Sequence, residues 1–149
     1  MKDLTREEIV SVLDRATEGA LAFTDGEKPY GVPIGHVYVN ESVHFSIFAK
    51  GRKWEMFQKN QNVCFTVFEW NDERTDWASV IIEGKMVQVT DMEEIKAVVR
   101  ANIVKSNKDL DEHLDKRLEY YINNEDNPNA VKIFKIETSQ VGGKKSGRS

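Results

Sequence analysis

The chain has 149 residues, 40% of them hydrophobic and 31% charged, which favours one globular domain and excludes collagen-like and low-complexity classes. With 21 Lys and Arg against 25 Asp and Glu, the net charge is −4, so the strongly basic surface of a nucleic-acid-binding domain is not expected. One cysteine, no long apolar run and a polar, acidic N-terminus favour a soluble cytoplasmic protein without a disulfide, membrane span or signal peptide.

The first predicted element is a helix. Thr5 and Glu8 have the spacing of a capping box, in which each side chain bonds the other residue's backbone N–H. Apolar residues then recur at helical spacing, and Gly19 is expected to end the helix.

A series of strands follows, and a hairpin turn at Asp25-Gly26 separates the first two. In one strand Val43, Phe45 and Ile47 alternate with polar residues, so His44 is expected to face solvent or a barrel mouth. The strands are predicted over residues 20–24, 30–39, 43–47, 63–70, 79–89 and 131–136.

Three further helices are expected. A glycine turn precedes a short helix at 52–57, and the pairs Asp91/Glu94 and Asp109/Glu112 repeat the capping-box pattern before two amphipathic segments. The short connections favour antiparallel pairing, so we predict a mainly β fold, a small closed or partly closed barrel with helices at its margins. Residues 1–141 are assigned to this domain and residues 142–149 to a mobile basic tail.

The turn Lys50-Gly51-Arg52-Lys53 is the most informative local feature. Three cations surround a glycine at a predicted helix N-terminus, where free N–H groups and the helix dipole favour an anion such as phosphate. A solvated basic turn is the competing interpretation. Pro33 is also unusual, because proline cannot donate to a sheet ladder and so indicates an edge, bulge or corner.

Other catalytic chemistries lack candidates. His36, His44 and His113 have no metal-ligand spacing, so no metal site is predicted. Cys64 lies in an apolar run, where a thiol is expected to be inert core. No residue stands out as a nucleophile, general acid or general base, and the catalytic residues are left unassigned.

The chain resembles the pyridoxamine 5′-phosphate oxidase-like, FMN-binding split-barrel family, especially its nitroimidazole-resistance-protein-like branch. The ordered series of matching segments extends over roughly residues 13 to 145. The segments are Gly19-Ala20-Leu21-Ala22-Phe23, Pro29-Tyr30-Gly31-Val32-Pro33-Ile34, Val43-His44-Phe45-Ser46, Gly51-Arg52-Lys53, Asn62-Val63-Cys64-Phe65, Ser79-Val80-Ile81-Ile82-Glu83-Gly84-Lys85, Val131-Lys132-Ile133-Phe134 and Gly143-Lys144.

This resemblance implies a six-stranded antiparallel Greek-key split β-barrel that forms a homodimer, with FMN at the subunit interface. It implies that Arg52 and Lys53 hold the phosphate. The other implied cofactor contacts come from three strands: Val32, Pro33 and Ile34 at the flavin ring, Ser46 and Ile47 at the phosphate and ribityl chain, and Ser79 and Val80 along the ribityl chain and ring.

Two departures from the family pattern matter. Ser46 stands where many members of the branch carry His, and the chain lacks the longer C-terminal segment of true pyridoxamine-phosphate oxidases, so vitamin B6 oxidation is not expected. The leading hypothesis is an FMN-dependent oxidoreductase that passes electrons from a reduced nicotinamide or another donor to a small acceptor.

Three alternatives stay open. The chain could bind flavin as a carrier without turnover, or use the same fold for haem or a deazaflavin. A barrel that binds oligonucleotides through Lys144, Lys145 and Arg148 is disfavoured by the acidic net charge.

Overall fold

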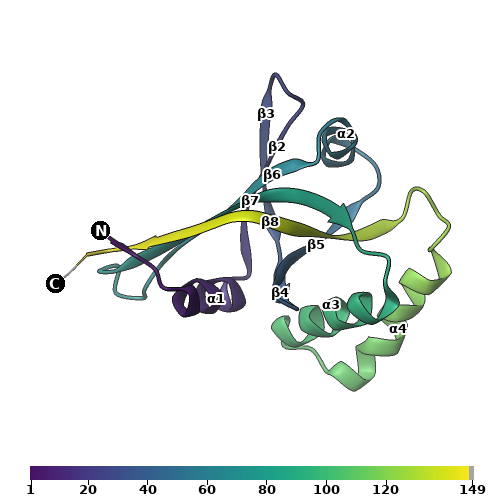
Figure 1. The fold of residues 1–149 in the computed structure, drawn as a ribbon. Helices are drawn as coiled ribbons and strands as arrows, with labels where there is room; N and C mark the ends of the chain where they lie inside the picture. The colour runs from purple at the N-terminus through teal and green to yellow at the C-terminus, as the bar shows by residue number, and fades with distance from the viewer. Residues whose placement is uncertain (148–149) are drawn as a thin grey trace.

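The computed structural model describes residues 1–147 as a mainly β fold with four helices (Figure 1). The helices are α1 (Arg6–Arg15), α2 (Arg52–Lys59), α3 (Met92–Lys105) and α4 (Leu110–Asn123). The strands are β1 (Lys2–Asp3), β2 (Glu18–Thr24), β3 (Pro29–Gly35), β4 (Val37–Val39), β5 (Ser42–Phe48), β6 (Asn62–Trp70), β7 (Trp77–Gln88) and β8 (Val131–Lys145).

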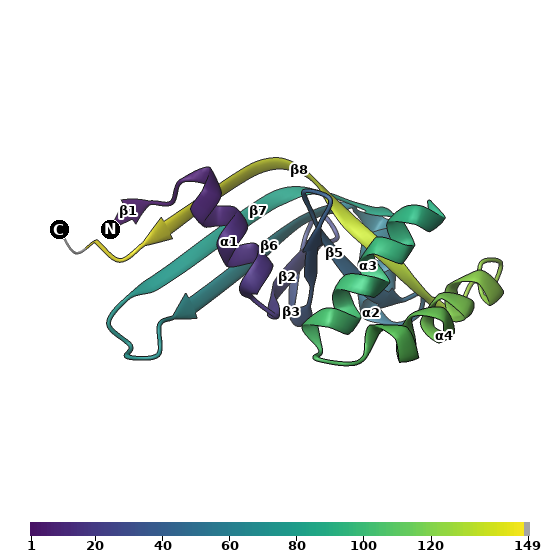
Figure 2. The ribbon, with the colours of Figure 1, turned by 90° about the horizontal axis from the view of Figure 1, so that it is seen from below.

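All strands belong to one curled antiparallel sheet in the order β3-β2-β6-β7-β8-β5-β4, with β1 added beside the end of β8. Because β3 and β4 follow each other in the chain but lie at opposite ends of this order, the sheet forms a barrel that is split between them. The split-barrel prediction is therefore confirmed. Figure 1 shows α1, α3 and α4 below the long strands and α2 above them, and Figure 2 shows α1 crossing β6 and β7.

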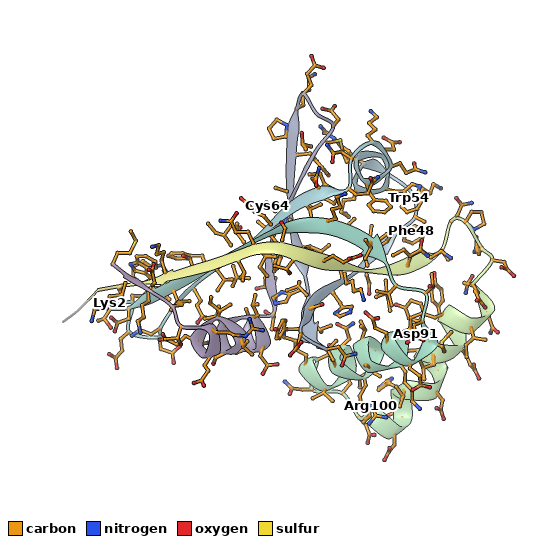
Figure 3. The ribbon with its side chains drawn as sticks, viewed as in Figure 1. Lys2, Phe48, Trp54, Cys64, Asp91 and Arg100 are labelled. Carbon is orange, nitrogen blue, oxygen red and sulfur yellow. The ribbon has the colours of Figure 1, made fainter. Side chains whose placement is uncertain are left out.

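Two hydrophobic clusters hold these layers together. The first fills the barrel with buried side chains from β2, β5, β6, β7 and β8 and is covered by α1 and α2; Phe45, Phe65 and Phe134 are among its fully buried members. Trp54 projects from α2 toward this cluster, 6.1 Å from Phe134 between ring centroids (Figure 3). The second lies under α3, whose Val98 and other apolar side chains pack against β4 and β8.

The helix starts follow the predicted signals. Thr5 and Glu8 form both bonds of the capping box, and Asp91 and Asp109 cap α3 and α4 by accepting backbone N–H bonds. The prediction for Gly19 is wrong, because α1 ends at Arg15 and Gly19 lies inside β2. A Cβ at Gly19 would stand 2.4 Å from the Thr66 carbonyl oxygen, so close strand packing explains this glycine.

Two segments differ in extent from their predictions. The segment 30–39 is divided into β3 and β4 by a corner at His36. Gly142 to Lys145, assigned from sequence to the tail, are the last part of β8 and pair with β7. There Lys144 pairs with Asp3 and Lys145 with Glu8. Residues 148–149 of the predicted tail lie outside the described residues, and Arg148 with them.

Candidate functional site

The cationic turn 50–53 joins β5 to α2, as predicted. Gly51 begins the helix with φ +91°, a left-handed conformation that favours glycine. No side chain caps α2 at this end, so its first N–H groups have no side-chain acceptor. A helix start of this kind, with Arg52 and Lys53 as its first residues, is suited to bind an anion.

Arg52 is held beside β3 by a cation–π contact. Its guanidinium carbon lies 4.3 Å from the ring centroid of Tyr30. Within residues 1–147, neither Arg52 nor Lys53 is ion-paired with a carboxylate within 4.0 Å. Because stacking uses only the face of the guanidinium, its N–H groups stay available for a phosphate.

The edge of β3 that faces away from β2 supplies the second part of the site. The Asp25 N–H donates to the Lys28 carbonyl at 3.2 Å and closes a two-residue turn. Since bonded and non-bonded pairs alternate from that point, the backbone groups of Gly31, Pro33 and Gly35 face the open edge. Pro33 fits there because it removes no N–H from the ladder with β2.

The other two residues predicted on β3 lie differently. The same alternation directs the backbone groups of Val32 and Ile34 toward β2, while their side chains pack against the barrel core. The polar groups that the open edge offers to a ligand therefore come from Gly31 and Gly35 as well as from Pro33. Sequence reasoning missed these two glycines because it could not tell which backbone groups face the edge.

On β5 and β7, two of the predicted contact residues are core residues. Ile47 and Val80 are only 2% and 1% exposed, so their side chains fill the barrel. Ser79 points out of the barrel and lies opposite Phe68. Ser46 lies on the other face of β5, near Tyr121 of α4, and burial raises the pKa of Tyr121.

A concavity of about 370 Å³ lies at the split, between the β3–β4 corner, β5 and the end of α3. We call it the split concavity. Ile34 and Ser46, which the family resemblance assigns to different parts of the cofactor, both line the split concavity. Its lining residues are Thr17, Ile34, Gly35, His36, His44, Ser46, Asn102, Lys105 and Ser106.

His44 is a buried member of this wall, and the prediction that it faces solvent or a barrel mouth is wrong. Its side chain is 0% exposed because α3 covers that face of β5. Nδ1 lies 3.0 Å from the Ser42 carbonyl and Nε2 lies 2.8 Å from the Glu94 carboxylate. Partial burial opposes ionisation of Glu94, but bonds from His44 and Lys135 hold the pKa of Glu94 below its usual value. Both ring nitrogens of this buried side chain therefore lie within hydrogen-bond distance of an oxygen atom.

His36, at the β3–β4 corner, is also buried. Burial lowers its pKa to about 4, so the ring is neutral at pH 7. Nε2 donates to the Leu13 carbonyl at 3.0 Å. Nδ1 is then a proton acceptor, and it has no hydrogen-bond partner within the described part of the chain.

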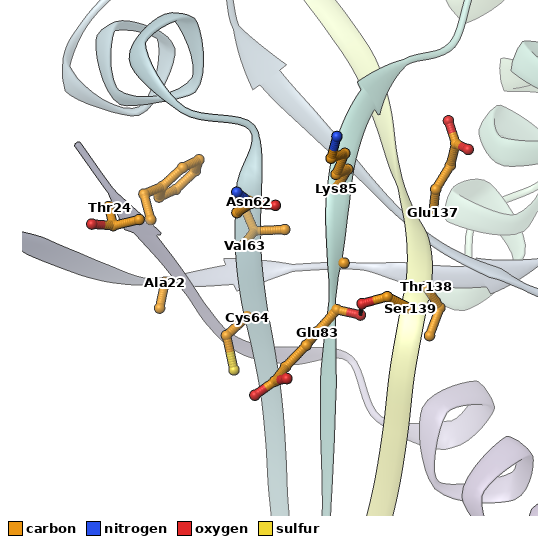
Figure 4. A pocket seen from close by; sticks show the side chains of 12 residues that line it. Ala22, Thr24, Asn62, Val63, Cys64, Glu83, Lys85, Glu137, Thr138 and Ser139 are labelled. Carbon is orange, nitrogen blue, oxygen red and sulfur yellow. Dashed lines mark hydrogen bonds between the residues drawn. The ribbon is translucent and has the colours of Figure 1, made fainter. Parts of the chain in front are cut away.

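A larger concavity of about 700 Å³ lies elsewhere, across β2, β6, β7 and β8 (Figure 4). It contains none of the predicted cofactor residues. Cys64 lines it, so the expectation that this thiol is core is wrong: the side chain is partly exposed and points out of the barrel. Burial, and after it the charge of Glu83, raises the pKa of Cys64. The thiol is therefore protonated at neutral pH and a poor nucleophile.

Neither a cluster of metal-ligand side chains nor a membrane-spanning helix is found in the described residues. Within residues 1–147, no group of three or more His, Cys, Asp or Glu side chains could hold a metal ion. No helix in that part of the chain is long and apolar enough to cross a membrane.

Comparison with known proteins adds a family match. A model of the pyridoxamine 5′-phosphate oxidase family matches residues 5–144. A comparison with curated proteins finds no match for the chain.

Solved structures share the fold over nearly the whole chain. An FAD-binding protein from Mesorhizobium loti is 23% identical with TM-score 0.67 and 98% coverage of both chains. A protein from Bacteroides thetaiotaomicron, whose name assigns it to 5-nitroimidazole antibiotic resistance, is 25% identical with TM-score 0.72 over 97% of this chain and 86% of that one. A heme-binding protein from Mycobacterium smegmatis is 11% identical with TM-score 0.61 over 93% of this chain and 55% of that one.

Proposed function

The chain belongs to the pyridoxamine 5′-phosphate oxidase family, and from this premise we propose that it is an FMN-binding flavoprotein that acts as an oxidoreductase. The observation that carries the proposal is the position of Arg52, stacked on Tyr30 beside β3 at the uncapped start of α2. In this position Arg52 would bind a phosphate, and the adjacent open edge of β3 offers free backbone polar groups to a planar ring.

The residues present fit FMN. Arg52, Lys53 and the first N–H groups of α2 would hold the phosphate, because all three kinds of group favour an anion. The open edge of β3, with the Pro33 carbonyl and the amides of Gly31 and Gly35, would orient the polar rim of the ring. FMN, when bound, supplies the redox chemistry, and the protein supplies binding, orientation and electrostatics.

Of the remaining residues predicted from sequence, Ser46 lies on the split concavity and is retained as a cofactor contact. Ile47 would contribute through its backbone, since its side chain belongs to the core, and Ser79 from the outer face of β7. Val80 is buried and paired with β6 and β8 on both sides, so it is not retained as a contact. Electrons would come from a reduced nicotinamide or another donor and pass to a small acceptor.

We also propose that the protein is a homodimer with FMN at the interface. Phe68, Trp70, Trp77 and Ile81 form an apolar group on the outer face of β6 and β7, which we call the outer-face patch. Phe68 is 59% exposed and stacks on Trp77 with 5.9 Å between ring centroids. Exposed apolar groups of this size favour burial against a partner, and the matching face of a second copy would provide it.

The proposal is tested by adding FMN, FAD or haem to the purified protein and recording spectra and affinities. We expect FMN to bind and the protein to show flavin absorption bands at about 375 and 450 nm. The heme-binding protein that shares the fold makes haem a second candidate. A Soret band and no flavin retention would replace FMN with haem.

The phosphate assignment is tested by replacing Arg52→Ala together with Lys53→Ala. Each loses a charge-assisted hydrogen bond, so FMN affinity should fall by at least about 100-fold while the fold is kept. Lys59→Ala, at the other end of α2, is the matched control and should bind FMN as the wild type does. Equal FMN affinity in the double variant and the control would refute the assignment.

The proposed oxidoreductase activity is tested separately, with the FMN-loaded protein. We expect NADH or NADPH oxidation with at least one small acceptor. Tight FMN binding without turnover across several donors and acceptors would make the protein a flavin carrier instead.

A further inference from the structure

We propose that the split concavity binds a small organic monoanion, a carboxylate, through Lys105 and Asn102 at the end of α3. The binding itself requires no flavin. The bound carboxylate would be the electron acceptor or resemble it, and this role rests on the proposed function.

Lys105 is a cation that lies partly buried without a close carboxylate. Its ammonium donates to the carbonyls of Ala16 and His36, at 3.2 Å in the second case. Within residues 1–147 no carboxylate oxygen lies within 4.0 Å of it, and Asp14 and Glu18 act on its charge only at longer range. An ammonium has three N–H donors, so one is left for a ligand.

The charges around the concavity favour one negative charge on that ligand. No Asp or Glu lines it, and the lining His44 is paired with Glu94 at 2.8 Å. Glu18 lies outside the lining, and its carboxylate accepts from the Thr17 hydroxyl. Among the lining residues, Lys105 supplies a full positive charge, which exceeds the roughly half negative charge at the C-terminal end of a helix. A monoanion therefore suits the concavity better than a phosphate dianion.

Among the neutral polar side chains that line the concavity, those already hydrogen-bonded within the protein are less available to a ligand. The hydroxyl of Thr17 donates to the Glu18 carboxylate, and that of Ser106 donates to the Asn102 carbonyl. The side-chain amide of Asn102 makes no hydrogen bond within the described residues. Asn102 and Lys105 are three residues apart in α3 and so lie on one face of the helix. Together they can donate to both oxygens of a carboxylate.

The position of the concavity connects it with the flavin. Ile34 and Ser46, two of the expected cofactor contacts, form its wall, and the Gly35 end of the open β3 edge reaches it. A carboxylate held by Lys105 would therefore lie beside the ring.

The test is calorimetric titration of flavin-free and FMN-loaded protein with benzoate, and in parallel with neutral benzamide and with inorganic phosphate. We expect benzoate to bind both forms, and to bind more tightly than benzamide or phosphate. Lys105→Met should weaken benzoate binding at least about tenfold, because a charged hydrogen bond is lost. Lys105→Arg should retain binding, and Lys96→Met, an exposed lysine of α3 that does not line the concavity, should match the wild type.

Asn102→Leu provides a second variant in case Lys105→Met does not fold, and it too should weaken benzoate binding. Equal binding of benzoate and benzamide, tighter binding of phosphate, or unchanged benzoate affinity in both variants would overturn the proposal. Loss of FMN affinity in Lys105→Met with no benzoate binding to any form would assign the concavity to the flavin instead. Because flavin-free protein is titrated first, failure of FMN binding does not affect this result.

Discussion

Individual residues at the split show how two buried histidines differ in their partners. His44 has an oxygen atom beside each ring nitrogen, the Ser42 carbonyl and the Glu94 carboxylate. His36 reaches one carbonyl, that of Leu13, and burial lowers its pKa so that the ring is neutral. The surroundings of each ring set this difference, because the two rings have the same intrinsic chemistry.

The neutral His36 makes stability depend on pH in a defined direction. Its pKa is about 4 in the folded protein, against an ordinary value of 6.5 for a histidine side chain in water. As pH falls below 6.5, the unfolded chain takes up a proton that the folded protein does not. Stability is therefore lost down to about pH 4, by about 3 kcal/mol from this residue.

His36→Leu should remove that contribution. The variant loses the bond to Leu13 and is expected to be less stable at pH 7, but its free energy of unfolding should change less between pH 7 and pH 4. Urea denaturation at several pH values measures the slope. His113→Leu, on the partly exposed face of α4, serves as control and should keep the wild-type slope; a wild-type slope in His36→Leu as well would contradict the assignment.

For single residues, the sequence correctly predicted the surroundings of those whose main contacts are near them in the chain. Gly51, Arg52 and Lys53 form a helix start that local sequence encodes, and the structure has this helix start as predicted. Cys64 and His44 were placed wrongly, because strand periodicity does not tell whether the second face of a strand is covered. Lys105 gave no signal, since its partners are 69 and 89 residues away in the chain.

Among the elements, α3 is docked on the sheet by one carboxylate. Glu94 bonds His44 of β5 and Lys135 of β8, and it makes no return bond to Asp91. The predicted capping box is therefore half formed, because the tertiary partners hold the Glu94 side chain. This link keeps α3, and with it the wall of the split concavity, against β5.

Glu94→Gln should destabilise the protein by about 2–3 kcal/mol, since it leaves buried His44 without its charged partner. Denaturant unfolding measures the loss, and amide hydrogen exchange should show it first in α3. Glu93→Gln, the exposed neighbour on the same helix, is the control. Equal stability of the two variants would show that the Glu94 contacts contribute nothing.

The extent of β8 illustrates what element prediction missed. Its glycines and lysines over residues 142–145 have the composition of a tail, yet they pair with β7 across a register shift at Glu83/Gly84. A Cβ at Gly84 would stand 2.2 Å from the Glu137 carbonyl oxygen, so only glycine fits this crossing. Pairing between distant segments overrides local composition here.

For the whole molecule, the outer-face patch is the feature that a single copy leaves unexplained. Phe68, Trp70 and Ile81 are 59%, 43% and 49% exposed on adjacent strands. Burying them against a second copy would remove this apolar surface from water and would bring two split barrels together.

Phe68→Glu should convert the dimer to a monomer, because a charge in the centre of an apolar interface is left without a partner. Light scattering after gel filtration measures the mass, with twice the chain mass expected for the wild type. Val104→Glu, at an equally exposed apolar residue on α3, should remain dimeric. A monomeric wild type, or a dimeric Phe68→Glu, would reject this interface.

The sequence by itself determined the fold class, the helix starts, the β2–β3 hairpin and the cationic turn, because these follow from periodicity, capping and turn chemistry within a few residues. The tertiary structure alone decided the closure of the barrel between β3 and β4, which leaves the outer edge of β3 unpaired, and the split concavity. Those features join segments that lie 50 to 90 residues apart in the chain, as His44 with Glu94 and Ala16 with Lys105 show. Their energy comes from burial and pairing between such segments, which no local pattern encodes.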